Sequence, residues 1–163
     1  MATKDDHISI TLNGEQVRLE AAAQDTLLEV LRREQLHGAR ESCGQGVCGT
    51  CTVLVGERTV ASCIMLAHLA DGGQVETVEG LGEPGDLSAV QRAFIDEAGF
   101  QCGFCTPGMI VTATQLLREN PDPTDDEIVH YLAGNICRCG AYPEIVKAVR
   151  AAADALAAGD TDR

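Results

Sequence analysis

The chain contains eight cysteines, whose thiols can bind metals or form disulfide bonds. They form two groups, one in each half of the chain. The first group is Cys43, Cys48, Cys51 and Cys63, and the second is Cys102, Cys105, Cys137 and Cys139. The N-terminus has no apolar leader and no twin arginine, which predicts a cytoplasmic protein. In that reducing compartment, so many thiols are typical of metal binding rather than of disulfide bonds.

The first group has the spacing Cys43-x4-Cys48-x2-Cys51, with Cys63 further along, which is typical of plant-type [2Fe–2S] ferredoxins. The flat iron–sulfide core needs four thiolates, three from a tight curl of the chain and the fourth from a neighbouring segment. Three glycines within the curl can adopt positive φ and let backbone N–H groups approach the sulfurs. A zinc knuckle is the alternative, but zinc ribbons usually present two separate Cys-x2-Cys pairs.

Two other patterns in the sequence do not support a site. Residues 44–49 match the dinucleotide-binding pattern G-x-G-x-x-G, but no strand is predicted immediately before them, no helix follows, and a predicted ligand lies inside. The four histidines, at positions 7, 37, 68 and 130, are scattered and none pairs with a cysteine loop. This disfavours a Rieske centre, in which two histidines replace two cysteines.

The second group consists of two pairs, Cys102-x2-Cys105 and Cys137-x-Cys139. This spacing alone leaves zinc and iron–sulfur open. Each pair lies just before a predicted helix start that is marked by a proline, Pro107 or Pro143. We expect both helix N-termini to direct their positive ends towards one negatively charged cluster.

The elements that must position the first group are predicted to be strands around a single helix. Alternating patterns predict strands over residues 7–12, 16–19, 52–55, 59–62 and 74–78. Asn13-Gly14 predicts a hairpin turn, and Thr26 with Glu29 forms the capping box of the helix.

The second half of the chain is predicted to be helical. Residues 80–85 are rich in residues that interrupt regular structure. Cap and proline signals then predict helices over residues 88–98, 107–118, 124–134 and 143–158. The sequence therefore predicts an α+β chain with a domain over residues 1–80, a linker over 81–86, a helical domain over 87–158 and a tail over 159–163.

The composition excludes several classes of partner. The chain has 163 residues, of which 45% are hydrophobic and 23% charged, which is typical of one globular domain or two small ones. The net charge of −13 argues against nucleic acid or an anionic membrane as a partner. No apolar run approaches the roughly 20 residues that a membrane-spanning helix needs.

The sequence resembles the small iron–sulfur subunit of the molybdenum hydroxylases, the family of xanthine dehydrogenase and aldehyde oxidase. The resemblance spans about residues 6–155 and is carried by three segments in the family's order: 41–54 (ESCGQGVCGTCTVL), 101–108 (QCGFCTPG) and 134–142 (GNICRCGAY). One departure is Ser42, where many relatives have glycine. Because serine reaches positive φ less readily, the loop geometry there is expected to differ slightly.

The resemblance implies a two-domain subunit with two [2Fe–2S] clusters. An N-terminal β-grasp domain of the plant-type ferredoxin fold would bind the first cluster through the first cysteine group. A C-terminal four-helix bundle would bind the second through the second group. Gln101 and Cys139 are implied to contact the molybdopterin of a partner subunit.

The family also implies partners. A large subunit would carry molybdopterin, as the cytosine dinucleotide, and a medium subunit would carry FAD. Hydroxylation at molybdenum removes two electrons, which would pass through the second cluster, then the first, to FAD or an external acceptor. The large subunit would select the substrate, and this chain would contribute no catalytic acid or base. The motif around Cys43 looks closer to the heterocycle and aldehyde branch than to the carbon monoxide branch.

Two alternatives remain. A free-standing two-cluster electron carrier is disfavoured because an exchangeable ferredoxin needs only the first domain. A zinc-stapled interaction module is disfavoured by the first cysteine loop.

Overall fold

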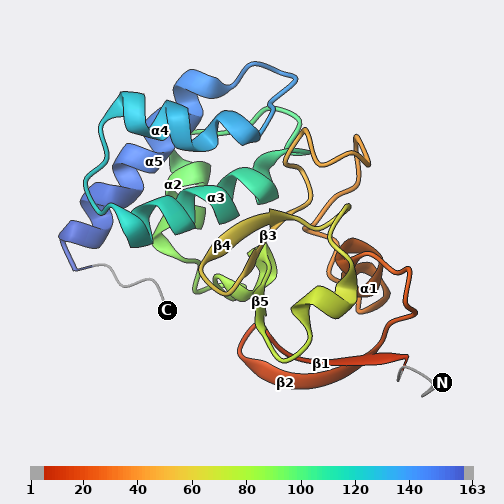
Figure 1. The fold of residues 1–163 in the computed structure, drawn as a ribbon. Helices are drawn as coiled ribbons and strands as arrows, with labels where there is room; N and C mark the ends of the chain where they lie inside the picture. The colour runs from red at the N-terminus through yellow and green to blue at the C-terminus, as the bar shows by residue number, and fades with distance from the viewer. Residues whose placement is uncertain (1–5, 160–163) are drawn as a thin grey trace.

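The computed structural model describes residues 6–159, and its elements follow the predicted order (Figure 1). The N-terminal half contains β1 (His7–Leu12), β2 (Glu15–Glu20), α1 (Leu27–Arg33), β3 (Thr52–Val55), β4 (Arg58–Ala61) and β5 (Gln74–Glu76). The C-terminal half contains α2 (Ala89–Asp96), α3 (Thr106–Glu119), α4 (Asp125–Tyr131) and α5 (Tyr142–Ala157). The α+β class is therefore confirmed. The start of the predicted first domain, residues 1–5, and most of the predicted tail, 160–163, lie outside the described residues.

Within the described residues, one five-stranded mixed sheet contains all the strands, in the order β2-β1-β5-β3-β4. β1 and β2 form the predicted hairpin, in which Asn13 and Gly14 both have positive φ, 49° and 88°. β1 pairs in parallel with β5, whereas β3 is antiparallel to both β4 and β5. The parallel pair joins the first strand of the chain to the last one.

Several predicted elements end earlier than expected, and two of these ends have a visible structural cause. The predicted strand over 74–78 ends at Glu76, because the backbone N–H of Thr77 donates to Asn13 Oδ1 at 2.8 Å and a 3₁₀ turn follows over Val78–Gly80. The predicted helix over 124–134 is α-helical only to Tyr131, and its last turn is a 3₁₀ turn over Leu132–Gly134. Helix ends commonly tighten in this way.

The helix starts follow their local signals. Thr26, Ser88 and Thr124 each form a capping box with the residue three positions later, so α1, α2 and α4 begin as predicted. α3 and α5 instead have a proline in the first turn, where its missing N–H costs no hydrogen bond. Along the described chain, no helix is both long enough and apolar enough to cross a bilayer.

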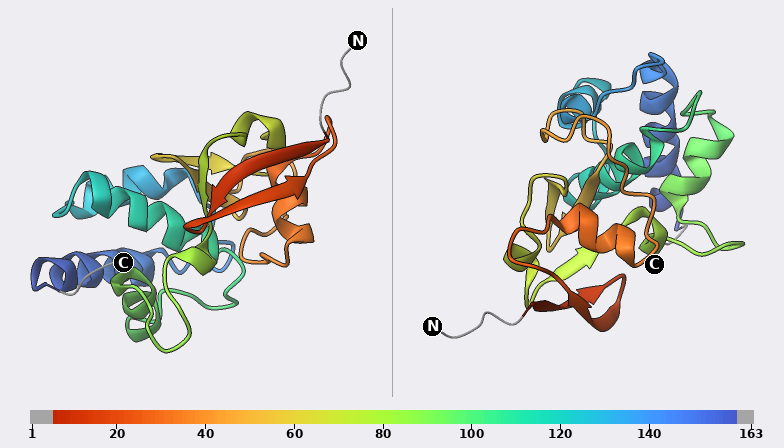
Figure 2. Two further views of the ribbon diagram at one scale, coloured as in Figure 1. Left: turned by 90° about the horizontal axis from the view of Figure 1, so that it is seen from below. Right: turned by 90° about the vertical axis from the view of Figure 1, so that its right-hand side faces the viewer.

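α3 packs against both halves of the molecule and so connects the sheet to the other helices. Ten consecutive residues of α3, 108–117, are buried, because the helix packs on β3 on one side and on other helices elsewhere. Adjacent residues of β3 point to opposite faces of the sheet, so Val53 belongs to the core beneath α1 whereas Leu54 belongs to the helical core. Figures 1 and 2 show the helical half beside the sheet, with the β1–β2 hairpin at the end far from α5.

Candidate metal centres

The loop between α1 and β3 gathers backbone donors around one sulfur. The N–H groups of Gln45, Cys48 and Val47 donate to Cys43 Sγ, with the Gln45 nitrogen 3.4 Å away, and the Cys48 thiol adds a further hydrogen bond. These donors favour the thiolate and lower the pKa of Cys43 to about 6. Cys43 is thus prepared to act as a metal ligand.

The predicted glycine geometry is confirmed. Gly44, Gly46 and Gly49 have φ values of 62°, 71° and 70°, which curl the loop so that its amides point inwards. Ser42 is absent from the positive-φ residues of the described chain, so the departure from glycine introduces no backbone strain there.

The fourth predicted ligand meets this loop from the end of β4. Burial and a hydrogen bond to Cys51 raise the pKa of the Cys63 thiol to about 11, and the N–H of Gly46 also reaches its sulfur. Cys63 also interacts electrostatically with Cys43. The first group therefore comes together as two contacting pairs, Cys43 with Cys48 and Cys51 with Cys63.

The second group is brought together in the same paired way. Cys102 contacts Cys139, and Cys105 contacts Cys137, while Cys102 also interacts electrostatically with Cys137. The N–H of Phe104 is the main cause of a lowered pKa at Cys102. Burial raises the pKa of Cys105 to about 12.

Backbone amides also stabilise the thiolate of Cys137. Burial opposes its ionisation, but hydrogen bonds from the N–H groups of Ala141, Cys139 and Gly140 and from the Cys105 thiol hold its pKa below the usual value. The N–H of Cys137 itself donates to the Tyr142 hydroxyl at 2.9 Å, which ties this loop to the start of α5. Cys105 is the N-cap of α3, so each pair precedes a helix start, as predicted.

Gln101 lies beside Cys139. Its side-chain Nε2 donates to the Cys139 carbonyl oxygen at 3.4 Å, and both residues are exposed. The two residues predicted to contact a pterin therefore occupy one exposed spot at the second cysteine group.

Sequence reasoning missed the residues that connect the two groups. Asn135 is only 6% exposed, and its Nδ2 donates to the carbonyl oxygen of Gly49 at 2.9 Å, inside the first loop. The next residue, Ile136, donates its backbone N–H to the Cys48 carbonyl oxygen at 2.9 Å and directly precedes the ligand candidate Cys137. Both residues lie in the segment 134–142 that carries the family resemblance, but that segment gave them no role. The hydrogen bond from Ile136 thus links Cys48 of the first group to the residue next to Cys137 of the second.

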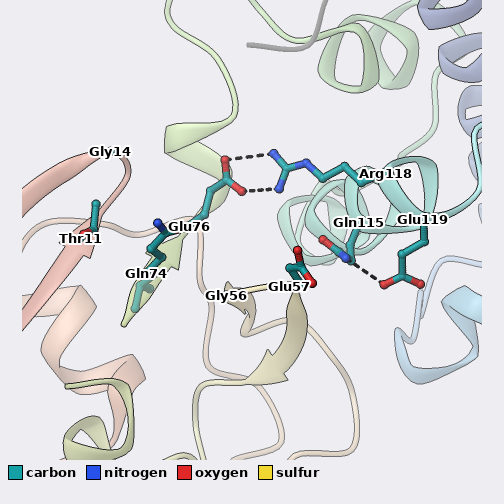
Figure 3. A pocket seen from close by; sticks show the side chains of 10 residues that line it. Thr11, Gly14, Gly56, Glu57, Gln74, Glu76, Gln115, Arg118 and Glu119 are labelled. Atoms are coloured by element: carbon teal, nitrogen blue, oxygen red, sulfur yellow. Dashed lines mark hydrogen bonds and ion pairs between the residues drawn. The ribbon is translucent and has the colours of Figure 1, made fainter. Parts of the chain in front are cut away.

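A cavity of about 1010 Å³ lies elsewhere, between the sheet and α3. Its described lining includes Glu57, Gln115 and Glu119 but no cysteine, and Gln115 Nε2 donates to Glu119 at 2.8 Å (Figure 3). Over residues 6–159, no three His, Cys, Asp or Glu side chains converge to hold a single metal ion.

The donor chemistry fits [2Fe–2S] clusters. Each cysteine group supplies four free thiols, arranged as two pairs, and a two-iron core takes two thiolates on each iron. Backbone N–H groups surround the sulfurs, as suits a cluster whose net charge is negative. The fold and the sites together define a two-centre iron–sulfur protein.

Known proteins agree with this class. Residues 10–79 match the 2Fe-2S iron-sulfur cluster binding domain, and residues 77–150 match the [2Fe-2S] binding domain. The chain is 44% identical over 151 residues to the nicotinate dehydrogenase small FeS subunit of Eubacterium barkeri, in a match that covers 92% of this chain and 96% of that one. The chain therefore belongs to the small [2Fe–2S] subunits of the molybdenum hydroxylase family.

Solved structures extend the agreement to three dimensions. A chain of quinoline 2-oxidoreductase from Pseudomonas putida superposes with a TM-score of 0.89 at 40% identity, covering 95% of this chain and 98% of that chain. The aldehyde oxidoreductase of Desulfovibrio desulfuricans gives a TM-score of 0.90 at 39% identity, covering 96% of this chain and 18% of that chain. In the second relative, the matching region is part of a much longer polypeptide.

Proposed function

We propose that this chain is the electron-transfer subunit of a molybdenum hydroxylase, and that it connects a molybdenum site on a larger partner subunit to FAD or an external acceptor. The observation that carries the proposal is the hydrogen bond from Ile136 to Cys48, which joins two groups of four thiols. When bound, two [2Fe–2S] clusters supply one-electron carriers, so the subunit can hold both electrons of one turnover.

Each cysteine group is assigned one cluster. The first cluster takes Cys43, Cys48, Cys51 and Cys63, and the second takes Cys102, Cys105, Cys137 and Cys139. We assign residues 1–80 to a β-grasp domain of the plant-type ferredoxin fold, residues 81–86 to a linker and residues 87–158 to a four-helix bundle. The change from one matching family to the other at residues 77–79 supports this division.

The chain's own residues hold, orient and shield the clusters. Backbone N–H groups donate to the sulfurs of Cys43, Cys63, Cys102 and Cys137 and stabilise negative charge there. Cys51, Cys105 and Cys137 are buried, which keeps water from those ligands. The chain supplies no acid or base for substrate chemistry.

The exposed end of the second group is the proposed contact with the large subunit. Gln101 and Cys139 lie together there and would contact the molybdopterin, which we propose is the cytosine dinucleotide. A medium subunit with FAD completes the assembly. We propose a cytoplasmic location for the complex, because a set of eight cysteines used for metal binding rather than for disulfide bonds suits a reducing compartment.

The test is the metal content of the natively purified protein and of two cysteine variants. The natively purified wild-type complex should contain a large subunit, with about four iron and about one molybdenum per copy of this chain. Cys51→Ser and Cys105→Ser should each lose about half of the iron and one of the two [2Fe–2S] EPR signals, and each variant is the control for the other.

Other outcomes would redirect the assignment. About four iron with no molybdenum and no partner would favour the free-standing two-cluster carrier. Zinc in place of two of the irons would overturn the second cluster.

A further inference from the structure

Arg40 precedes the first cysteine loop in the chain, and backbone hydrogen bonds attach it to that loop. Its backbone N–H donates to the Thr50 carbonyl oxygen at 3.1 Å, and the Thr50 hydroxyl donates back to the Arg40 carbonyl oxygen at 2.9 Å. The same hydroxyl is 3.2 Å from Cys48 Sγ. The backbone of Arg40 is therefore fixed relative to a ligand of the first cluster.

The side chain of Arg40 reaches the second cysteine loop instead. Its Nη1 donates to the carbonyl oxygen of Gly103 at 2.7 Å, between Cys102 and Cys105. Its guanidinium carbon is 5.4 Å from the centre of the Phe104 ring, within the range of a cation–π contact. Arg40, a residue of the first half, thus places a positive charge beside the loop that contains Cys102 and Cys105.

That charge is not paired with a carboxylate. Among the described residues, no ion pair involves Arg40. Arg40 is also half-buried, so salt screens its field less than that of an exposed side chain. Its charge is therefore available to compensate thiolate charge in the loop that it contacts.

We propose that Arg40 is a positioning residue that raises the reduction potential of the second cluster. The inference rests on the proposed function, because it requires a cluster at the second group. Reduction would add one electron, released when the partner subunit oxidises its substrate, and would convert one ferric ion to ferrous. The charge of the ligated cluster changes from about −2 to about −3, so a nearby positive charge stabilises the reduced form more than the oxidised form.

The experiment is a redox titration of the full chain in its native complex, followed by EPR. The EPR signal lost in Cys105→Ser identifies the second cluster. We expect Arg40→Gln to lower the equilibrium constant for reduction of that cluster by roughly threefold to tenfold, where tenfold corresponds to ~59 mV for one electron. The first cluster should shift less, and the shift should persist in high salt. Arg40→Lys keeps the charge and should restore most of the potential.

Arg58→Gln is the matched control, since Arg58 is exposed at the start of β4 and the substitution removes the same charge. A second-cluster potential in Arg40→Gln equal to that of the control would overturn the proposal, as would equal shifts of both clusters. Loss of iron from Arg40→Gln would also overturn it, because Arg40 would then only maintain the structure of the cysteine loops. A wild-type complex without a second [2Fe–2S] signal would instead refute the proposed function itself.

Discussion

Two glycines allow the two cysteine loops to approach each other. Gly108 lies in the first turn of α3, and a Cβ built on it would be 2.2 Å from the carbonyl oxygen of Gly49. Gly49 lies between the ligand candidates Cys48 and Cys51, so its carbonyl cannot move without moving the first group. The absence of a side chain at position 108 is therefore a condition for the observed spacing of the two sites.

Gly108→Ala tests this close approach. Alanine favours a helix over glycine by about 1 kcal/mol, but the clash is with backbone, and overpacking costs about 1–3 kcal/mol and at times more. We expect the clash to dominate and the free energy of unfolding to fall in urea denaturation. Gly134→Ala is the control, because a Cβ there meets nothing within 4 Å. If Gly108→Ala were as stable as the control, the contact would not constrain the loops.

At the scale of elements, one carboxylate ties the C-terminal end of α1 to the loop that precedes the helix. Asp25 Oδ2 accepts a hydrogen bond from the backbone N–H of Ala22 at 2.8 Å and forms an ion pair with Arg33, from the last turn, at 2.6 Å. The side chain of Asp25 is only 14% exposed. The hydrogen bond from Arg33, followed by that from Ala22, lowers the pKa of Asp25.

This shift predicts a pH dependence of stability. A carboxylate whose pKa is lowered by folding stabilises the folded state above its unfolded pKa of about 3.9, and that stabilisation is lost as the pH falls through the folded value. Asp25→Asn should therefore be less stable than wild type at pH 7, and the difference should shrink as the pH falls below about 4. Urea denaturation between pH 7 and pH values below about 4 measures the difference in the free energy of unfolding, and Asp96→Asn, at an exposed position, is the control. A difference that grew with acidity would mean that the folded state does not favour the ionised carboxylate.

At the scale of the whole molecule, two polar contacts between the halves differ in their burial. One is the buried hydrogen-bond network of Asn135 with Gly49 and with Thr112, whose hydroxyl is 3.0 Å from Asn135 Oδ1. The other is the ion pair of Arg118 with Glu76, at 2.7 Å, whose side chains are 40% and 27% exposed (Figure 3). Exposed ion pairs contribute about 0–1 kcal/mol, whereas an unsatisfied buried polar group costs about 1–3 kcal/mol. The buried network should dominate.

We therefore expect Asn135→Ala to lower the free energy of unfolding by about 2 kcal/mol and Glu76→Gln by less than ~1 kcal/mol. Added salt should reduce the effect of Glu76→Gln and leave that of Asn135→Ala nearly unchanged. Urea denaturation at low and high salt compares the two variants. A larger loss from Glu76→Gln would mean that the surface pair holds the halves together.

Much of the fold and of the metal sites follows from short-range signals in the sequence. The hairpin turn at Asn13, the three capping boxes and the positive φ of the loop glycines depend on residues a few positions apart. Cysteine spacing likewise predicted which thiols form each group. The ends of β5 and α4 were less predictable, because a side chain from elsewhere and a tightened last turn decided them.

The sequence by itself determined the local structure and the ligand candidates, because steric preferences and hydrogen bonds between neighbours select them. Only the tertiary structure decided that Arg40 reaches Gly103, 63 residues away, and that Asn135 reaches Gly49, 86 residues away. It also decided the parallel pairing of β1 with β5. Such contacts depend on how distant segments of the chain pack together, and no local pattern encodes the distance between segments that packing brings together.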